Sequence, residues 1–514
     1  MSMDLNTRLQ SRRLMFDGGT GSSLVEKGLK PGEMPETWNL LHPDIIEGLH
    51  CAYITAGADI IKTNTFGAYS FKLRERQEET VKAALAIAKR AVAACGKDTL
   101  IALDVGPLGK ILEPFGDTSF DEAVGYFKEL ITLGKENADL ILVETMSDLY
   151  EIKAAIVAAK ECCDLPIAVT VALDERGRLL TGADVETVVA FLEGMGVFAL
   201  GVNCGFGPKA VKPYVEAMIR CASVPVIANP NAGLPELKEG RAIYSLTPER
   251  YREEATELLA LGVSILGGCC GTTPSHIAAV SSDVLASGAV LPKDKAQARV
   301  TSYRKTLSLT VGDVAIGTHL DPRLSAEIAE YLADGDMDSL VDECFSEVGD
   351  VDIITVSAQT LAEDEGKILC QEIRTLQESL DCPMLIRANS PAALRDACRY
   401  YNGKPLLALD SAENGGIDEV FSIVKTYGAL FAVKLCGKNE ACLAFVNGVY
   451  DKAKAYGLLA RDILFDLAAD TDAETLSLLA SQNIPLIATD IPTETQRDSL
   501  AKLGLSLPTA VAFV

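Results

Sequence analysis

Three cysteines have the residue type and the setting needed to hold a metal ion. Cys204 lies in the stretch Gly201-Val-Asn-Cys-Gly-Phe-Gly-Pro208, and Cys269 and Cys270 are adjacent in Gly267-Gly-Cys-Cys-Gly-Thr-Thr-Pro274. Each stretch ends a short apolar run and continues into glycine, which is typical of a strand entering a tight turn. Because the carboxyl ends of the strands of a parallel α/β barrel open on one face, we expect the three thiols to meet there.

Zinc is the metal that such a set of ligands favours. Zn²⁺ prefers thiolate sulfur, and three protein ligands leave a fourth tetrahedral position for a substrate or water. A thiol with a pKa of about 8.5 is mostly protonated at pH 7, whereas coordination deprotonates it. The site would therefore supply a sulfur nucleophile. The alternative is that the three cysteines are small buried residues at strand ends, but two glycine-rich strand ends favour metal binding.

Composition and charge restrict the class of protein. The chain has 514 residues, of which 48% are hydrophobic and 23% charged, so that more than one domain is expected. Its net charge of −25 argues against a nucleic-acid or anionic-membrane partner, because the field repels both. The 14 cysteines follow no regular framework, and neither a basic-then-apolar leader nor a membrane-spanning apolar run is present. These features predict a soluble, cytoplasmic protein.

The pattern of strands and helices around the cysteines predicts a (β/α)8 barrel. Short apolar runs alternate with stretches rich in Ala, Leu, Lys and Glu, in which apolar residues recur at helical spacing. Eight strands buried on both faces favour a barrel over an open sheet. The expected strands are 14–17, 59–63, 100–105, 139–144, 166–173, 197–204, 224–229 and 263–269.

A second series of eight strands follows a segment without apolar period. We expect domain 1–287, a linker over 288–302 and domain 303–514, so that the fold class is α/β with two TIM-type barrels in tandem. No sequence remains for an eighth helix after 509–514, so the second barrel is expected to be incomplete or closed in an unusual way. The remaining expected strands are 314–317, 351–356, 383–388, 405–410, 430–435, 462–466 and 485–490.

The first roughly 290 residues resemble the homocysteine S-methyltransferase family, and within it the homocysteine-binding module of cobalamin-dependent methionine synthase. All the matching stretches fall at or just after expected strand ends, where the active face of such a barrel lies. They are Phe16-Asp-Gly-Gly-Thr-Gly21, Gly57-Ala-Asp59, Thr63-Asn-Thr-Phe66, Gly106-Pro107, Gly116-Asp-Thr-Ser-Phe-Asp-Glu-Ala123, Val143-Glu-Thr-Met146 and the two cysteine stretches.

The resemblance implies roles for individual residues. Cys204, Cys269 and Cys270 would bind zinc, and the homocysteine sulfur would take the open position. Asp17 and Glu144 would hold the substrate's amino group through charge-assisted hydrogen bonds, while backbone amides receive its carboxylate. Asn64 is a further candidate for this pocket, and Asn231 is a candidate zinc ligand in the absence of substrate. The alternatives are capping, exposed or turn-forming roles for these side chains.

The second half is similar to a remote, divergent pterin-binding barrel. Ala315-Ile-Gly-Thr-His319 opens it where that family has a Gly-Glu-Arg-Thr-Asn-like stretch, and only Asn389, Asp410 and Asp466 remain as candidate pterin contacts. Buried pterin recognition needs matched donors and acceptors, since an unpaired buried polar group costs about 1–3 kcal/mol. We therefore expect weak folate binding or none. The barrel would be either a divergent folate site or, as we favour, a docking and structural module for a methylated corrinoid partner.

These observations predict a homocysteine S-methyltransferase that makes methionine with zinc. The chain shows no Asp-x-His-x-x-Gly stretch, so a corrinoid donor would arrive on a separate protein or as a free cofactor; methyltetrahydrofolate is the other donor considered. Two alternatives stay open. One is a thiol methyltransferase with a different acceptor, or with a sulfonium or betaine donor, and the other is a non-catalytic homocysteine-binding partner protein.

Overall fold

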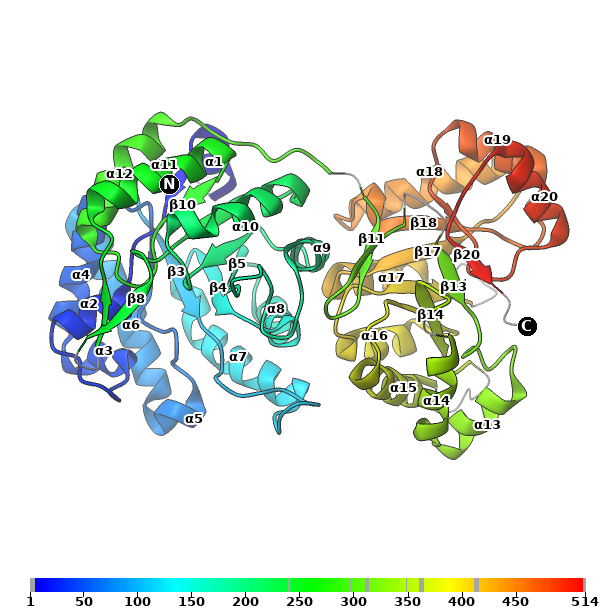
Figure 1. The fold of residues 1–514 in the computed structure, drawn as a ribbon, viewed down its shortest axis with the longest axis horizontal. Helices are drawn as coiled ribbons and strands as arrows, with labels where there is room; N and C mark the ends of the chain where they lie inside the picture. Colours follow the sequence, from blue (N-terminus) through cyan, green and yellow to red (C-terminus); the bar gives the residue numbers. More distant parts are fainter. Residues whose placement is uncertain are drawn as a thin grey trace. The chain divides into compact units, whose positions relative to one another are not determined.

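The computed structural model describes residues 5–238, 241–295, 297–309, 314–347, 349–359, 365–410 and 416–511 (Figure 1). The chain forms two compact units, and the boundary along the sequence follows Lys295. Within the described residues, no helix combines the length and the apolar character needed to cross a membrane.

The first unit is a closed ring of parallel strands, as predicted. The strands follow one another in the order β1-β10-β7-β6-β5-β4-β3-β2, and a single bridge between Phe16 and Ile60 joins the two ends. Each expected strand is present, although several are shorter than the apolar runs. Their bounds are β1 (Leu14–Met15), β2 (Ile60–Lys62), β3 (Leu100–Val105), β4 (Leu140–Met146), β5 (Ile167–Val171), β6 (Ala199–Asn203), β7 (Val226–Asn229) and β10 (Ile265–Leu266).

Helices surround this ring, and local signals set their ends. Ser119 forms a capping box with Glu122 at the start of α7, and left-handed Gly57 ends α4. The helices are α1 (Leu5–Ser11), α2 (Thr20–Glu26), α3 (Trp38–Leu41), α4 (Pro43–Ala56), α5 (Ser70–Leu73), α6 (Gln77–Cys95), α7 (Phe120–Gly134), α8 (Leu149–Cys162), α9 (Val185–Gly194), α10 (Pro208–Cys221), α11 (Pro248–Leu261) and α12 (Pro274–Ala286), with short 3-10 turns at Pro35–Thr37, Arg74–Arg76 and Lys135–Asn137.

Apolar side chains fill the interior of the ring. Leu14, Ile60, Leu142 and Ile265 belong to one buried cluster, and Leu5 of α1 joins it. Removing such side chains from water is the main force that holds the ring closed. A hairpin that the sequence did not predict, β8 (Pro235–Lys238) with β9 (Arg241–Tyr244), follows β7.

The second unit is also a closed parallel ring, with the order β19-β18-β17-β16-β15-β14-β13-β20. A bridge between Ala488 and Thr509 completes it, so the eight strands close although the last is short. Residues 512–514 of the last expected strand lie outside the described residues. The strands are β13 (Ala315–Gly317), β14 (Ile353–Ser357), β15 (Met384–Ala388), β16 (Leu406–Leu409), β17 (Leu430–Lys434), β18 (Ile463–Asp466), β19 (Leu486–Ile487) and β20 (Thr509–Val511).

The helices of the second unit follow its strands, and a hairpin covers one end of its core. The hairpin is formed by β11 (Arg299–Thr301) and β12 (Thr306–Ser308), and Val300 joins the core cluster, so the last part of segment 288–302 is a strand. The helices are α13 (Ala326–Asp334), α14 (Met337–Glu347), α15 (Glu365–Ser379), α16 (Pro391–Tyr400), α17 (Ile417–Tyr427), α18 (Asn439–Ala455), α19 (Ala473–Ser481) and α20 (Glu494–Leu503), with a 3-10 turn at Ala460–Asp462.

Candidate metal and acceptor site

The three cysteines meet at the carboxyl ends of β6 and β10. Their sulfur atoms all lie within 4.8 Å of one another, and the Sγ atoms of Cys204 and Cys270 are 3.9 Å apart. Cys269 is buried, whereas Cys204 and Cys270 are partly exposed. Cys204 directly follows β6 and adopts a left-handed backbone conformation with φ 61°. This strained turn directs its thiol toward the pair on β10.

Two glycines of the second cysteine stretch are needed for close packing. A Cβ on Gly267 would lie 2.4 Å from Cβ of Phe16, on the neighbouring strand segment. Gly271 has φ 77°, and a Cβ there would lie 2.2 Å from the ring of Tyr244. Glycine therefore lets the loop that carries Cys269 and Cys270 pack against β1 and the hairpin.

The thiols are protonated at neutral pH in this arrangement. Hydrogen bonding with Cys269 lowers the pKa of Cys204, but hydrogen bonding with Cys270 and burial outweigh it and raise that pKa to about 11. For Cys270, hydrogen bonding with Cys204 lowers the pKa, while hydrogen bonding with Cys269 and burial raise it to about 11. Hydrogen bonding with Cys204, followed by burial, raises the pKa of Cys269. Three thiolates would need a bound cation to coexist here.

A cavity of about 380 Å³ opens beside the cysteines. Its wall comes from the carboxyl ends of several strands and from the segments that follow them, which is where barrel enzymes bind substrates. The residues that line it are Gly19, Thr20, Gly21, Pro35, Glu36, Lys62, Thr63, Asn64, Phe66, Asp104, Glu144, Thr145, Cys204, Cys269 and Cys270.

A buried lysine lies between the two predicted substrate-binding carboxylates. The Nζ atom of Lys62 is 3.4 Å from Oε2 of Glu144 and 3.8 Å from Oδ1 of Asp17. The backbone N–H of Lys62 donates to Oδ2 of Asp17 at 2.9 Å. Burial lowers the pKa of Lys62, but the charges of Glu144 and Asp17 raise it by more, so that the net pKa lies well above the ordinary value. Burial raises the pKa of Asp17 to about 7, against the influence of Lys62.

Two further acidic residues of the cavity wall were not predicted. Asp104, in β3, is buried, and burial followed by the charge of Glu144 raises its pKa well above the ordinary value. Glu36 accepts a hydrogen bond from the N–H of Gly67 at 2.6 Å, and burial raises its pKa. Asp104 lies within the expected buried strand 100–105, and an acid in such an apolar run is a signal that could have identified it, whereas Glu36 lies in no expected strand or motif.

The two predicted asparagines differ in their surroundings. Asn64 lines the cavity, but its Nδ2 donates to the carbonyl of Pro35 at 2.8 Å and to Oδ1 of Asn39 at 2.9 Å, so its amide group braces the β1-to-α3 segment. Asn231 is buried, and its Oδ1 has no hydrogen-bond partner within the described part of the chain. The next residue, Ala232, donates its N–H to the carbonyl of Cys270 at 3.0 Å.

The hairpin brings a tyrosine to the cysteines that the sequence did not predict. Tyr244 hydrogen-bonds to Cys270, and this contact lowers the pKa of the thiol. Burial, followed by the charge of Cys270, raises the pKa of the Tyr244 hydroxyl. The hydroxyl therefore acts as a donor to a Cys270 thiolate.

The first half of the chain matches a known protein family. The profile of the family described as "Homocysteine S-methyltransferase" matches residues 14–284, which contain all the residues of the cavity. The chain belongs to this family.

Similar proteins include methionine synthases and a homocysteine methyltransferase. The methionine synthase of Mycobacterium tuberculosis is 32% identical over 304 residues, which are 55% of this chain and 25% of the relative. That of Mycobacterium leprae is 31% identical over 303 residues, with the same coverage. The chain thus matches about a quarter of the length of these relatives. The metallated form of the homocysteine methyltransferase MmuM of Escherichia coli has a TM-score of 0.47 and 21% identity, over 54% of this chain and 99% of that one.

A dihydropteroate synthase is also among the similar solved structures. A dihydropteroate synthase from Stenotrophomonas maltophilia has a TM-score of 0.30 and 16% identity, over 41% of this chain and 91% of that one.

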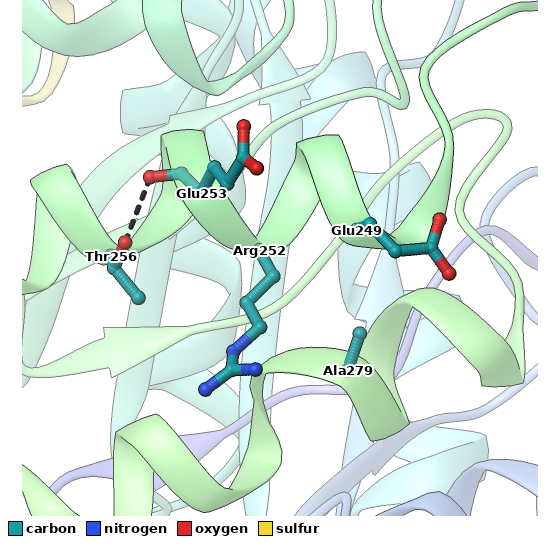
Figure 2. Close-up of a pocket in the computed structure, with 5 residues that line it drawn as sticks. All are labelled: Glu249, Arg252, Glu253, Thr256 and Ala279. Atoms are coloured by element: carbon teal, nitrogen blue, oxygen red, sulfur yellow. Dashed lines mark hydrogen bonds between the residues drawn. The ribbon is translucent and has the colours of Figure 1, made fainter.

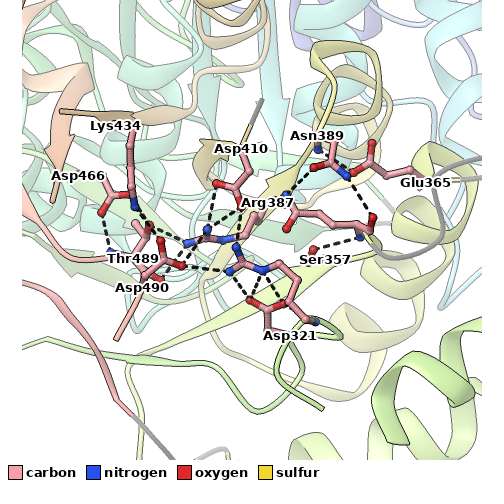
Figure 3. A network of polar contacts seen from close by, with 12 residues as sticks. Asp321, Ser357, Glu365, Arg387, Asn389, Asp410, Lys434, Asp466, Thr489 and Asp490 are labelled. Carbon is pink, nitrogen blue, oxygen red and sulfur yellow. Dashed lines mark hydrogen bonds and ion pairs between the residues drawn. The ribbon is translucent and has the colours of Figure 1, made fainter. Parts of the chain in front are cut away.

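The candidate pterin contacts of the second unit lie in a dense network of ion pairs (Figure 3). Asp410 accepts from Arg387 at 2.8 Å, from Arg323 at 2.9 Å and from Gln359 at 3.0 Å. Arg387 is fully buried in β15. The carboxyl ends of the second ring thus carry residues that already bind one another.

The other two candidates are engaged in the same network. Asp466 accepts from the N–H of Thr489 at 2.8 Å and from Nζ of Lys434 at 3.0 Å. The N–H of Asn389 donates to Glu365 at 2.7 Å, and its Nδ2 donates to the carbonyl of Gln359 at 3.1 Å. A ligand that used these groups would first have to break contacts between charged residues.

A depression of about 420 Å³ lies on the outside of the first barrel, between α11 and α12 (Figure 2). It is lined by Glu249, Arg252, Glu253, Thr256 and Ala279. Arg252 is paired with Asp283 at 2.6 Å, and Thr256 donates to the carbonyl of Glu253 at 2.8 Å. The depression contains none of the predicted site residues and offers no group for methyl transfer.

Proposed function

We propose that the first barrel, residues 1–287, transfers a methyl group to the thiol of homocysteine and so makes methionine. The observation that carries this proposal is the convergence of three cysteine sulfurs within 4.8 Å beside a cavity that also contains Glu144. Family membership supports the acceptor, and it supports the class of reaction.

The cysteine set fits a zinc ion. Three sulfur donors with one open side are the ligands of a catalytic zinc site. Asn231 Oδ1, which is buried and has no hydrogen-bond partner among the described residues, is available as a further oxygen donor when no acceptor is present. When bound, zinc would supply a deprotonated, electron-rich acceptor sulfur at neutral pH. Cys204, Cys269 and Cys270 would hold the ion, and Tyr244 would support the Cys270 thiolate by donating a hydrogen bond.

The remaining residues bind and orient the acceptor. Asp17 and Glu144 offer carboxylates to an ammonium group, and the buried setting of both strengthens such contacts. The start of α2, at Thr20 and Gly21, lines the same cavity and offers backbone amides to a carboxylate. An amino acid fixed at both groups would have its thiol directed toward the cysteines.

The methyl donor is proposed to be a corrinoid carried by a separate protein. Exposed apolar side chains occur in several segments that follow the strands around the cavity, and a partner protein docked over the cavity would remove them from water. They are Phe66, Ile111, Phe115, Leu180, Leu234 and Ile243. The second barrel, residues 303–514, would serve as a docking and structural module, because its polar strand ends are occupied by their own ion pairs.

A methyl-transfer assay tests this proposal. The full chain would be loaded with zinc and given homocysteine with methylcobalamin, methyltetrahydrofolate, S-methylmethionine, S-adenosylmethionine or betaine, with zinc content measured on the same sample. We expect methionine with methylcobalamin. Methionine only with a sulfonium or betaine donor would contradict the donor assignment, and no product with any donor despite one zinc per chain would favour a homocysteine-binding protein.

Two cysteine variants separate the metal site from general thiol effects. Cys204→Ser should lose both zinc and turnover, because one of three ligands is removed. Cys221→Ser is the matched control, because this residue ends α10, its sulfur contacts the carbonyl of Ala217 at 2.8 Å, and it is not among the residues that line the cavity. Full zinc content in Cys204→Ser would refute the ligand assignment.

A further inference from the structure

The ammonium group of Lys62 lies in the acceptor pocket, at the place proposed for the ammonium group of the acceptor. Lys62 ends β2, is 3% exposed and lines the cavity together with the cysteines. Its Nζ lies 3.4 Å from Glu144 and 3.8 Å from Asp17, the two carboxylates proposed to bind the acceptor. A second ammonium group cannot join these carboxylates without lying beside the charge of Lys62.

The pocket also contains another partner for this lysine. Lys62 pairs in register with Ala102 of β3. Asp104 lies two residues beyond Ala102 in β3, so the side chains of Asp104 and Lys62 point to the same side of the sheet. Asp104 lines the cavity, and its Oδ1 has no hydrogen-bond partner in the part of the chain that is described. The four-carbon stem of a lysine lets its Nζ exchange between such neighbours.

We propose that Lys62 is a specificity-determining residue that acts as an internal substitute for the acceptor's ammonium group. In the empty pocket it neutralises Asp17 and Glu144. An amino-acid thiol displaces Nζ from these carboxylates toward Asp104, whereas a thiol without an amino group binds with Lys62 left in place. The pocket is therefore expected to accept ω-mercapto carboxylic acids as well as homocysteine. This inference rests on the proposed acceptor site.

The test compares two thiols that differ only in the amino group. Homocysteine and 4-mercaptobutanoate would be titrated calorimetrically into the zinc-loaded full chain and into its Lys62→Met variant. Met fills a similar volume without charge. In the variant, homocysteine no longer has to displace a cation and should bind about tenfold more tightly, while 4-mercaptobutanoate should bind about tenfold more weakly beside two unpaired carboxylates. The ratio of the two dissociation constants should thus change about 100-fold.

Two further variants keep the result interpretable. Lys62→Gln retains a hydrogen-bond donor and should change the ratio in the same direction, even if Lys62→Met folds poorly. Lys72→Met removes an exposed lysine of α5 that contacts the Tyr69 and Phe71 rings, and it should leave the ratio within about threefold of the starting value.

The possible outcomes distinguish this inference from the proposed function. Homocysteine binding with an unchanged ratio in both Lys62 variants would overturn the role of Lys62 alone. Binding of 4-mercaptobutanoate but not homocysteine to the unaltered chain, with homocysteine binding gained in Lys62→Met, would support Lys62 and overturn homocysteine as the acceptor. Failure of both thiols to bind any zinc-loaded form would overturn both proposals.

Discussion

Asn203 holds Thr145 through both ends of its amide group. The N–H of Thr145 donates to Oδ1 of Asn203 at 2.9 Å, and Nδ2 of Asn203 donates to the hydroxyl of Thr145 at 2.7 Å. Thr145 follows Glu144 at an irregularity in the pairing of β4 with β5 and has φ 61°, while Asn203 precedes Cys204. The pair therefore links the strained turn that presents a carboxylate to the one that presents a thiol.

Loss of this link should loosen the cysteine site. Asn203→Ala removes both hydrogen bonds, so we expect zinc affinity to fall by about 10–100-fold, as is usual when a residue that orients a metal ligand is removed. Competition with a chromophoric chelator measures the change. Thr145→Ser keeps the hydroxyl and should retain most of the affinity. A folded Asn203→Ala protein with unchanged affinity would show that the link does not position Cys204.

Removal of the Tyr244 hydroxyl should make zinc binding more sensitive to acid. The pKa of Cys270 is lowered by Cys204 and raised by Cys269 and burial, to about 11, and Tyr244 adds a smaller lowering, so Tyr244→Phe should raise that pKa and leave less thiolate at a given pH. Zinc should consequently be released at a higher pH than in the unaltered chain, as followed by chelator titration between pH 5 and 8. Tyr214→Phe serves as the control, because its hydroxyl donates to the carbonyl of Glu175. Identical release curves for the two variants would contradict the assigned contact.

Buried His50 should make the first barrel less stable in mild acid. Burial lowers its pKa from 6.5 to about 4, so between these values the unfolded chain binds a proton that the folded chain does not. Stability therefore falls as the pH decreases from about 6.5, by about 2 kcal/mol at pH 5. His50→Leu should remove this part of the pH dependence.

Fluorescence offers a measurement confined to the first barrel. The chain has one tryptophan, Trp38, and it lies buried in α3, so urea unfolding at pH 7 and pH 5 can be followed there. His319→Leu, in the second unit, should leave the Trp38 transition unchanged at both pH values. An equal loss of stability in His50→Leu and the unaltered chain would refute the role of His50.

The ion-pair network of the second unit should depend on Arg387. Its loss would leave Asp410 and Asp490 with fewer cationic partners, although Arg323 and Lys434 remain. We expect Arg387→Met to destabilise the second unit by about 3 kcal/mol, which hydrogen exchange of β15 and β16 would detect. Arg395→Met removes only an exposed pair with Glu419 at 3.8 Å and should cost less than about 1 kcal/mol.

The same network predicts the response to folate. Burial raises the pKa of Asp490, but Arg387, then Lys434 and Arg323, lower it to about 2, and all three cations form ion pairs with this carboxylate. Calorimetry with methyltetrahydrofolate on the full chain should therefore detect no tight binding. A submicromolar dissociation constant would instead identify the second barrel as a working folate site.

The strands of both barrels could be predicted from the sequence, because buried parallel strands are apolar throughout and their ends are marked by glycine or polar residues. That the three cysteine sulfurs lie close together could be predicted for the same reason, since each stretch directly follows such a run. Lys62 could not. It ends the apolar run of β2, where a charged residue ordinarily indicates the start of an exposed segment, and only the folded ring places it opposite Glu144.

Contacts between distant segments account for the other omissions. Tyr244 lies in a short hairpin of mixed apolar and polar residues, which no long apolar run marks, and its contact with Cys270 depends on the turn at Gly271. Arg323 and Arg387 are far apart in the sequence but bind the same Asp410. Periodicity reports which residues are buried and gives no information on such pairings.

The strands of the first ring are shortest beside the cysteines. β1 and β10 have two residues each and are neighbours, and only one bridge links β1 to β2. Where these strands are short, backbone hydrogen bonds of the loops that follow them hold the sector, such as Gly268 N–H to the Asp17 carbonyl at 3.0 Å and Cys269 N–H to the Pro230 carbonyl at 2.9 Å. A cation bound by Cys204, Cys269 and Cys270 would connect the end of β6 to the loop that follows β10. These two strands lie on either side of β7. Metal binding would then stabilise this part of an already closed ring, and amide protection of β1 and β10 would report it.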